Sequence, residues 1–241
     1  MVPLLMTRRL AAARRFVADL PEDLRARLDV TYAPLMEIRP RAASIDLSDV
    51  QGVIFTSANA VAIASRETAA RCPAYCVGTQ TTEAARHAGW QATCVGGCAD
   101  ALVDTLLSRM PLGPLVHLRG AHGRGAIADR LSDAGLPCRV QVVYDQALLP
   151  LSDAARRLVG AQSSVIVPLF SPRTARHFAS LWEDAGNLHL IALSKAVAEP
   201  LECLNFKTLH VSEAADSKAM AQAVRDAAQR VSRLEGSAGA E

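Results

Sequence analysis

The sequence predicts an α/β protein with two lobes, each a parallel sheet of about five strands flanked by helices in a flavodoxin-like arrangement. Apolar runs of four to seven residues alternate with stretches that carry apolar residues at helical spacing, from one end of the 241-residue chain to the other. About ten such runs are too many for one ordinary open sheet in a chain of this length. Segments of the first half also recur in the second half, which favours two sheets.

The elements follow from these runs in chain order, and several helices end at Gly or Pro. The expected strands are Pro3–Thr7, Asp29–Tyr32, Gly52–Thr56, Ala74–Val77, Ala92–Val95, Leu115–Arg119, Arg139–Tyr144, Ser163–Leu169, Leu188–Ala192 and Thr208–Val211. The expected helices are Arg9–Leu20, Ala58–Ala69, Thr81–Ala88, Ala99–Met110, Arg124–Ala134, Arg173–Ala185, Lys195–Leu204 and Lys218–Leu234.

The repeats show how the two lobes divide the chain. Val53–Ala62 resembles Val167–Arg176, each a strand that runs into a serine and then a helix. Leu4–Arg8 opens a strand–helix–strand unit as Val116–Gly120 does in mid-chain, so one copy is split between the chain ends. The predicted domains are residues 1–34 plus 149–234 for the split lobe, 38–143 for the continuous lobe, and 235–241 for a disordered tail of small polar residues.

Two chain crossings join the predicted lobes. Tyr32–Glu37 and Val143–Leu149 are expected to be extended linker segments that form a hinge. A cleft between two lobes is the usual place for a ligand, so the sequence predicts a ligand site there.

Composition limits the function. The chain has 26 basic and 24 acidic side chains and a net charge of +2, which does not suit a general basic face for nucleic acid. No apolar run reaches the roughly 20 residues that span a bilayer. The order of residues in Met1–Leu10 is the reverse of a secretory signal, which indicates a cytoplasmic protein without a membrane segment.

The six cysteines invite a metal or disulfide interpretation. Cys72 and Cys76 share a three-residue gap with Cys94 and Cys98, whereas most zinc knuckles have a two-residue gap. We therefore expect reduced thiols and no metal.

Polar residues cluster just after predicted strands, where parallel sheets bind ligands through backbone N–H groups and helix N-termini. The candidate ligand-binding residues are Thr7, Arg8, Thr56, Ser57, Asn59, Gly78, Thr81, Arg119, Gly120, Arg124, Ser171, Ser194 and Lys195. Their cations suit a polyanionic ligand. Ser57, Thr81 and Ser171 also suit helix N-caps, so capping is an alternative role for each.

The sequence offers no nucleophile–base pair, no paired carboxylates and no metal cluster, so any catalysis is expected to rely on positioning. His122 lies in a glycine-rich loop and is interpreted as a loop residue. Tyr144, at a strand end beside a crossing, is either a buried structural phenol or a proton donor in the cleft.

The polar motifs, taken together, match a known pattern. They are Thr7-Arg8, Thr56–Val61, Val77–Thr81, Leu118–Arg124, Val143-Tyr144 and Phe170–Pro172. Their order and spacing resemble the uroporphyrinogen-III synthase family over almost the whole chain.

The resemblance implies a cofactor-free enzyme that cyclises hydroxymethylbilane, a polycarboxylate, with inversion of its terminal pyrrole ring and loss of water. It also implies a flexible monomer, and a transient contact with porphobilinogen deaminase is compatible with it. Tyr144 matches the family tyrosine thought to assist departure of the substrate hydroxyl. The residues that match cleft-facing positions of the family are Thr56, Ser57, Thr81 and Ser171.

Several positions depart from the family pattern. Arg9 replaces a proline, Phe170 replaces a common threonine, and Ile191–Lys195 stands where the family commonly has a glycine followed by a threonine pair. A non-catalytic small-molecule-binding paralogue therefore stays open. A nucleotide-binding protein is a further alternative, because a glycine-rich loop follows Leu115–Arg119 and Asp145 follows the next strand, although the glycines do not stand in dinucleotide-binding order.

Overall fold

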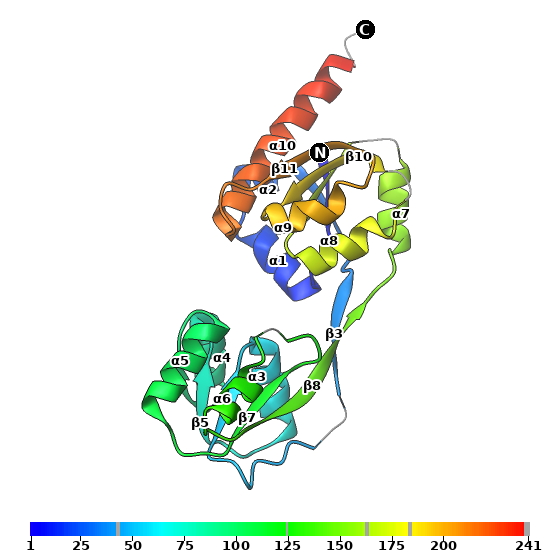
Figure 1. Ribbon diagram of the computed structural model, residues 1–241. Helices are drawn as coiled ribbons and strands as arrows, with labels where there is room; N and C mark the ends of the chain where they lie inside the picture. The colour runs from blue at the N-terminus through cyan, green and yellow to red at the C-terminus, as the bar shows by residue number, and fades with distance from the viewer. Residues whose placement is uncertain (42–43, 124, 162–163, 183–184, 239–241) are drawn as a thin grey trace. The chain divides into compact units, whose positions relative to one another are not determined.

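The computed structural model describes residues 1–241 except 42–43, 124, 162–163, 183–184 and 239–241 (Figure 1). The chain forms two compact units. Unit 1 comprises Met1–Glu37 with Leu148–Glu241, and unit 2 comprises Ile38–Ala147. Within the described residues, no helix combines the length and apolar character that a bilayer span requires.

Unit 1 is built on a five-stranded sheet in the order β11-β10-β9-β1-β2. Its strands are β1 (Val2–Met6), β2 (Leu28–Tyr32), β9 (Val165–Leu169), β10 (Ala185–Ala192) and β11 (Phe206–Val211). All its strand pairings are parallel. Its helices are α1 (Leu10–Ala18), α2 (Glu22–Arg25), α7 (Asp153–Gly160), α8 (Pro172–Ala179), α9 (Lys195–Ala198) and α10 (Ser217–Ala238), with a 3₁₀ turn η1 (Glu199–Leu201).

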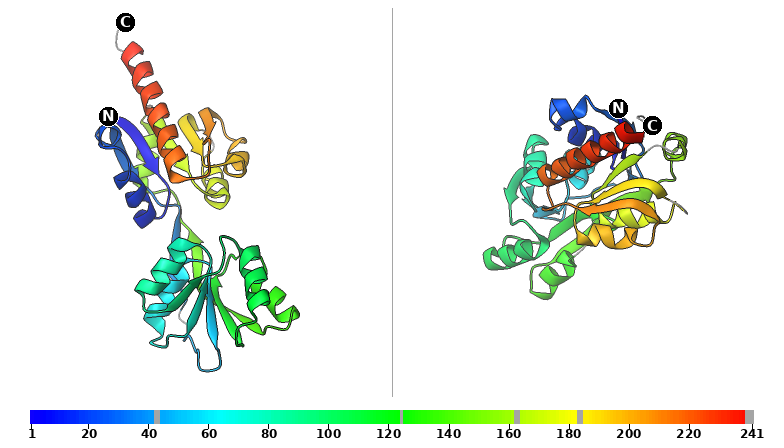
Figure 2. Two further views of the ribbon diagram at one scale, coloured as in Figure 1. Left: turned by 90° about the vertical axis from the view of Figure 1, so that its left-hand side faces the viewer. Right: turned by 90° about the horizontal axis from the view of Figure 1, so that it is seen from above.

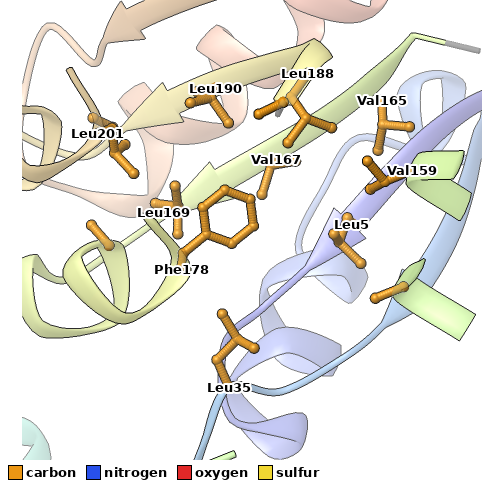
Figure 3. Close-up of a cluster of buried hydrophobic side chains, with 14 of the residues drawn as sticks. Leu5, Leu35, Val159, Val165, Val167, Leu169, Phe178, Leu188, Leu190 and Leu201 are labelled. Atoms are coloured by element: carbon orange, nitrogen blue, oxygen red, sulfur yellow. The ribbon is translucent and has the colours of Figure 1, made fainter. Parts of the chain in front are cut away.

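Helices cover both faces of this sheet, because successive strand side chains point to opposite faces. Leu4 lies on the face that packs against α1, α2 and α10. Leu5 lies on the other face, where Phe178 of α8 is fully buried among apolar residues of β9 and β10 (Figure 3). Figure 2 shows the strands of the sheet between these helices.

Unit 2 has a six-stranded sheet in the order β3-β8-β7-β4-β5-β6. Its strands are β3 (Met36–Pro40), β4 (Gly52–Phe55), β5 (Pro73–Cys76), β6 (Gln91–Cys94), β7 (Leu115–Gly120) and β8 (Cys138–Leu148). Its helices are α3 (Ala58–Glu67), α4 (Thr79–His87), α5 (Ala99–Arg109) and α6 (Ile127–Asp133). Val53 and Phe55 pack against α3 and α4, and Ile54 packs against α5 and α6. The two helix-covered, mostly parallel sheets confirm the predicted fold class.

Both chain crossings between the units lie in strands. The Arg41 N–H donates to the Val143 carbonyl and the Leu149 N–H to the Leu35 carbonyl, both at 3.0 Å, so β3 runs antiparallel to β8. The sequence predicts two extended linker segments here but no strand at Met36–Pro40, and it ends the β8 strand at Tyr144 rather than Leu148.

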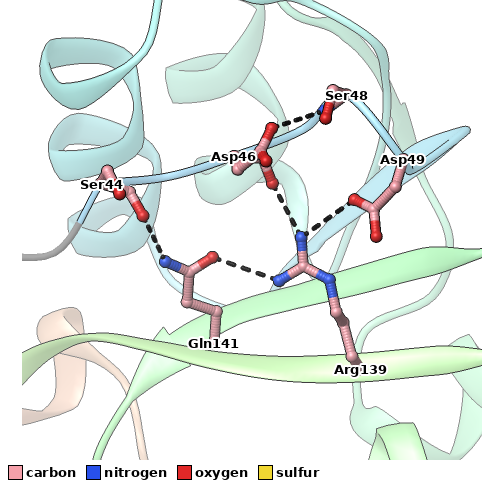
Figure 4. Close-up of polar contacts among 6 residues, drawn as sticks. All are labelled: Ser44, Asp46, Ser48, Asp49, Arg139 and Gln141. Carbon is pink, nitrogen blue, oxygen red and sulfur yellow. Dashed lines mark hydrogen bonds and ion pairs between the residues drawn. The ribbon is translucent and has the colours of Figure 1, made fainter.

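The segment between β3 and β4 is tied to β8 by polar contacts (Figure 4). Arg139 donates to the Asp46 carbonyl at 2.7 Å and pairs with the Asp49 carboxylate at 3.3 Å. Gln141 donates to the Ser44 carbonyl at 3.0 Å. Each exposed contact is worth little alone, but together they hold this stretch against the strand.

Several predicted helix boundaries are wrong. The sequence predicts one helix over Lys195–Leu204, but α9 changes into η1 at Glu199 because Pro200 has no N–H to continue the α-helical ladder. The helix expected over Arg173–Ala185 ends at Ala179, and Ala185 already pairs with Phe206. The short helices α2 and α7 are not predicted at all.

Helix α10 extends beyond its predicted end. It continues to Ala238, whereas the sequence predicts a disordered tail from residue 235; residues 239–241 lie outside the described part of the chain. Met220, Val224, Ala228 and Val231 form a buried stripe that anchors the helix on the sheet. Once a helix is anchored, each added residue gains one hydrogen bond without a new nucleation cost.

Candidate functional site

The carboxyl ends of β4 and β7 border a cavity of about 320 Å³, which we call the unit 2 pocket. Thr56 directly follows β4, Arg119 and Gly120 end β7, and Gly120 is paired in register with Tyr144 of β8. The pocket is lined by Thr56, Ser57, Asn59, Val77, Ala99, Arg119, Gly120, His122, Gly123, Tyr144 and Gln146. The structure thus brings six of the predicted site residues together: Thr56, Ser57, Asn59, Arg119, Gly120 and Tyr144.

The N-terminus of α3 forms one wall of this pocket. Ser57 is its N-cap, and its hydroxyl oxygen accepts from the Asn59 backbone N–H and the Asn59 side-chain amide, both at 3.2 Å. The capping role predicted for Ser57 is therefore present. A capped helix N-terminus still carries a partial positive charge, which favours an anionic group in the pocket.

Tyr144 is both buried and part of the pocket lining. Its side chain is only 4% exposed and belongs to the apolar cluster between the sheet and helices α3 and α4. Its ring lies against Gly120, where an added methyl group would be 2.5 Å from Cε2 and 2.6 Å from Cζ. The absence of a side chain at Gly120 therefore permits this position of the phenol.

Arg119 supplies a cation at the pocket. Its guanidinium donates to the carbonyls of Gly120 and Ala121 at 3.1 and 3.3 Å, which holds the side chain over the loop that follows β7. Arg124, the second cation predicted in this loop, lies outside the described residues.

Two polar residues of the pocket are absent from the predicted site set. His122 is exposed and lines the pocket from the glycine-rich loop, and its position directly after a strand was a usable signal. Gln146 lies two residues beyond Tyr144 in β8, on the same face of the strand. It could not be predicted while the strand was expected to end at Tyr144.

His117 lies behind the pocket, in the middle of β7. It is 3% exposed, and its Nε2 is 3.2 Å from the Thr56 hydroxyl oxygen. Burial, assisted by the nearby positive charge of Arg119, lowers the pKa of His117 to about 4. The ring is therefore neutral at physiological pH.

Gly78 and Thr81 are not among the residues that line the unit 2 pocket. Gly78 is the N-cap of α4 and has a φ of 76°, a left-handed conformation that favours glycine. Thr81 lies inside α4 and is 7% exposed. Thr81 is therefore not an N-cap, because the helix begins two residues earlier than predicted.

In unit 1, the predicted residues follow three neighbouring strands. Thr7 and Arg8 come after β1, Ser171 after β9, and Ser194 with Lys195 after β10, so parallel pairing gathers them at one edge of the sheet. Thr7 is 1% exposed, and its hydroxyl has no hydrogen-bond partner within the described residues.

Arg8 and Ser171 have defined surroundings at this edge. The Arg8 guanidinium lies 4.0 Å from the ring centroid of Phe170, so the phenylalanine provides a surface for a cation. Burial lowers the pKa of Arg8, and the positive charges of Arg9 and Arg15 add to this effect. Ser171 caps α8, because its oxygen accepts from the Thr174 N–H at 3.1 Å.

Two observations away from these edges bear on the alternatives. Within the described residues, no group of three or more His, Cys, Asp or Glu side chains could hold a metal ion, and all six cysteines are free. Asp145, which a nucleotide-binding protein would use for its ligand, makes a bidentate pair with Arg41 at 2.8 and 2.9 Å.

The fold and the site define a class of protein. Both units are mostly parallel, helix-covered sheets that present hydroxyl groups, helix N-termini and arginines at the carboxyl ends of their strands, which is typical of α/β proteins that bind anionic ligands. Residues 21–222 match the family described as "Uroporphyrinogen-III synthase HemD". The chain belongs to the uroporphyrinogen-III synthase family.

A solved structure shows the same fold. The uroporphyrinogen-III synthetase of Helicobacter pylori 26695 is similar with a TM-score of 0.65 and 15% identity, covering 94% of this chain and 99% of that one. A mutant uroporphyrinogen III synthase from the extremely thermophilic bacterium Thermus thermophilus is 13% identical with a TM-score of 0.47, covering 95% of this chain and 100% of that one. No curated protein sequence matches the chain.

Proposed function

We propose that this chain is an active uroporphyrinogen-III synthase, a hydro-lyase that cyclises hydroxymethylbilane with inversion of the terminal pyrrole ring. Its family consists of enzymes of porphyrin biosynthesis that act on a tetrapyrrole. The observation that carries the proposal for this chain is the unit 2 pocket, where a helix N-terminus, Arg119 and a tyrosine meet. The departures from the family pattern noted at Arg9, Phe170 and Ile191–Lys195 all lie outside it.

The chemistry requires a proton at the leaving group. The substrate hydroxyl departs as water when a pyrrole nitrogen lone pair expels it and an acid protonates its oxygen. The Tyr144 phenol is the acid in this proposal. The substituted α-carbon of the terminal ring attacks the resulting azafulvene and gives a spiro intermediate. The bond from that carbon to its original methylene bridge then breaks, and the free α-carbon of the same ring bonds to the released methylene, which leaves the ring inverted. The proton lost when the last pyrrole regains aromaticity returns to the Tyr144 oxygen, so the net change is loss of one water.

The remaining residues hold carboxylates of the substrate. In unit 2, hydrogen-bond donors and positive charge come from Thr56, the N-terminus of α3 and Arg119. These groups suit ionised carboxylates, which accept hydrogen bonds and cannot donate them. In unit 1, Arg8 offers a positive charge, and the Thr7 hydroxyl, which has no hydrogen-bond partner within the described residues, offers a donor at the same sheet edge. We retain the following residues as proposed substrate contacts: Ser57, Asn59, Gly78, Thr81, Gly120, Arg124, Ser171, Ser194 and Lys195.

The wider expectations stay part of the proposal. We expect a cytoplasmic monomer that needs no cofactor and receives its substrate from porphobilinogen deaminase, with which it makes a transient contact. The composition argues against a general basic face for nucleic acid, because acidic and basic side chains are nearly balanced.

A coupled assay tests the function. Porphobilinogen deaminase converts porphobilinogen to hydroxymethylbilane, the protein is added, and the oxidised uroporphyrin isomers are separated by chromatography. Isomer III supports the proposal. Isomer I alone, the spontaneous product, from a folded sample would refute it in favour of a non-catalytic binding protein.

The role of Tyr144 is tested by Tyr144→Phe, with Tyr75→Phe as a matched control. Tyr75 is a half-buried phenol in β5 of the same unit and is not among the residues that line the pocket. Loss of a general acid predicts a fall in kcat of about 100-fold for Tyr144→Phe. Equal kcat values for the two variants would remove Tyr144 from the mechanism.

A further inference from the structure

His117 is a polar ring in the middle of β7, with buried apolar residues on both sides in the sequence. Leu115, Val116 and Leu118 in β7 are all fully buried, and His117 itself is 3% exposed. A buried imidazole loses its hydration and must regain hydrogen bonds inside the protein. An aliphatic residue would pack at this position without that cost. Packing alone therefore does not account for a histidine here.

The partner of His117 is Thr56, a residue of the pocket. In the parallel pairing of β4 with β7, Ile54 lies opposite His117, and Thr56 is two residues further on, on the same face of the sheet. Thr56 is half-buried, contacts the ring through its hydroxyl at 3.2 Å, and also lines the pocket. The ring therefore contacts the hydroxyl of a residue that lines the proposed substrate pocket.

We infer that His117 is a positioning residue that aims the Thr56 hydroxyl at a substrate carboxylate. A threonine hydroxyl has one hydrogen and two lone pairs. When the neutral ring carries its proton on Nε2, it donates to the Thr56 oxygen, and the hydroxyl hydrogen points toward the pocket. With the other tautomer, Thr56 would donate to the ring and present only lone pairs to an anion. This inference rests on the proposed function of the unit 2 pocket.

The surroundings of the ring agree with this role. Burial and the charge of Arg119 lower the pKa of His117, so the ring acts through hydrogen-bond geometry rather than through a positive charge. A cavity of about 50 Å³ borders His117 on the side of α6 and is also lined by Arg119 and Gly123. A leucine at position 117 therefore has room and does not overpack the site.

A double-mutant cycle tests the inference through the isomer III assay. The variants are His117→Leu, Thr56→Val and the double variant, with His117→Gln as a conservative rescue whose amide can donate from the position of Nε2. We expect Thr56→Val to raise KM about tenfold, as for loss of a hydrogen bond to a charged group. His117→Leu is expected to raise KM by a similar factor with little change in kcat, and His117→Gln to restore most of it.

The decisive comparison is the effect of His117→Leu in the Thr56→Val background. If His117 acts through the Thr56 hydroxyl, KM does not rise further once that hydroxyl is gone. The matched control is His189→Leu, which removes a ring of equal burial from unit 1 and should leave KM unchanged. Each variant is first shown to be folded by its thermal unfolding.

Three outcomes overturn the inference, and the third is distinguishable from the first two. If the wild type makes isomer III but the KM effects of the two substitutions multiply, or His117→Leu leaves KM unchanged, His117 does not position Thr56. If the folded wild type makes isomer I only, the proposed function fails, and the inference that rests on it fails as well.

Discussion

Acidification should destabilise unit 2 through His117, and the size of the effect follows from its surroundings. The folded protein holds the pKa of His117 at about 4, against 6.5 for an ordinary histidine. Below pH 6.5 His117 is protonated in the unfolded chain, whereas in the folded chain it stays neutral until the pH falls to about 4. The contribution of neutral His117 to the free energy of unfolding is therefore intact above pH 6.5 and is lost as the pH falls from 6.5 to about 4.

The magnitude can be worked from this difference. At pH 5 the unfolded histidine is almost fully protonated, whereas only about a tenth of the folded rings carry a proton. Proton linkage then predicts that His117 alone removes about 2 kcal/mol from the free energy of unfolding between pH 7 and pH 5. This is a large share of the stability of a small domain.

Urea unfolding monitored by tryptophan fluorescence measures this loss. The chain has two tryptophans, and Trp182→Phe leaves Trp90 as a reporter of unit 2. Trp90 is 3% exposed and lies 5.1 Å from the ring centroid of Phe55, so its emission should change when the unit unfolds.

The control is His117→Gln in the same background, which removes the titrating group and keeps a hydrogen-bonding side chain. Its free energy of unfolding should fall between pH 7 and pH 5 by about 2 kcal/mol less than that of the protein with His117. An identical pH dependence in the two proteins would refute the reasoning, because all other titrating groups are shared.

Three further predictions follow from packing and capping. Gly120→Ala should displace the Tyr144 ring and lower kcat in the isomer III assay while isomer I still forms spontaneously; unchanged kcat would show that the ring can shift at no cost. Phe178→Ala should lower the free energy of unfolding of unit 1 by about 3–5 kcal/mol in urea, and a loss under 1 kcal/mol would contradict its place in the core. Ser171→Ala should cost about 1 kcal/mol in the same measurement, whereas Ser171→Thr should retain most of the cap to Thr174.

Local pattern was enough to predict most of the fold. Short apolar runs such as Val53–Phe55 can be buried on both sides only in a sheet covered by helices, so the alternation along the chain indicates a parallel α/β protein. The internal repeat then divided the strands between two sheets. Fold class and recognition of the family therefore needed no tertiary information.

The missed elements depend on partners far away in the sequence. Met36–Pro40 has no strong strand pattern and becomes β3 because β8, about a hundred residues later, hydrogen-bonds to it. Helix α7 is short, and it is held by burial of Ala155 and Val159 against the sheet and by the Ser152 cap. A weak local preference for strand or helix does not fix the structure of such a segment until it packs against or pairs with another part of the chain.

The same distinction applies to the site. The rule that ligands gather at the carboxyl ends of parallel strands was enough to select Thr56 and Arg119 as candidates from the sequence alone, and the family resemblance added Tyr144; all three line the unit 2 pocket. Only the tertiary structure showed that Thr81 is buried within a helix and that His117 stands behind Thr56. The physical reason is that side-chain direction and hydrogen-bond partners are set by strand register and helix packing, which join residues remote in sequence.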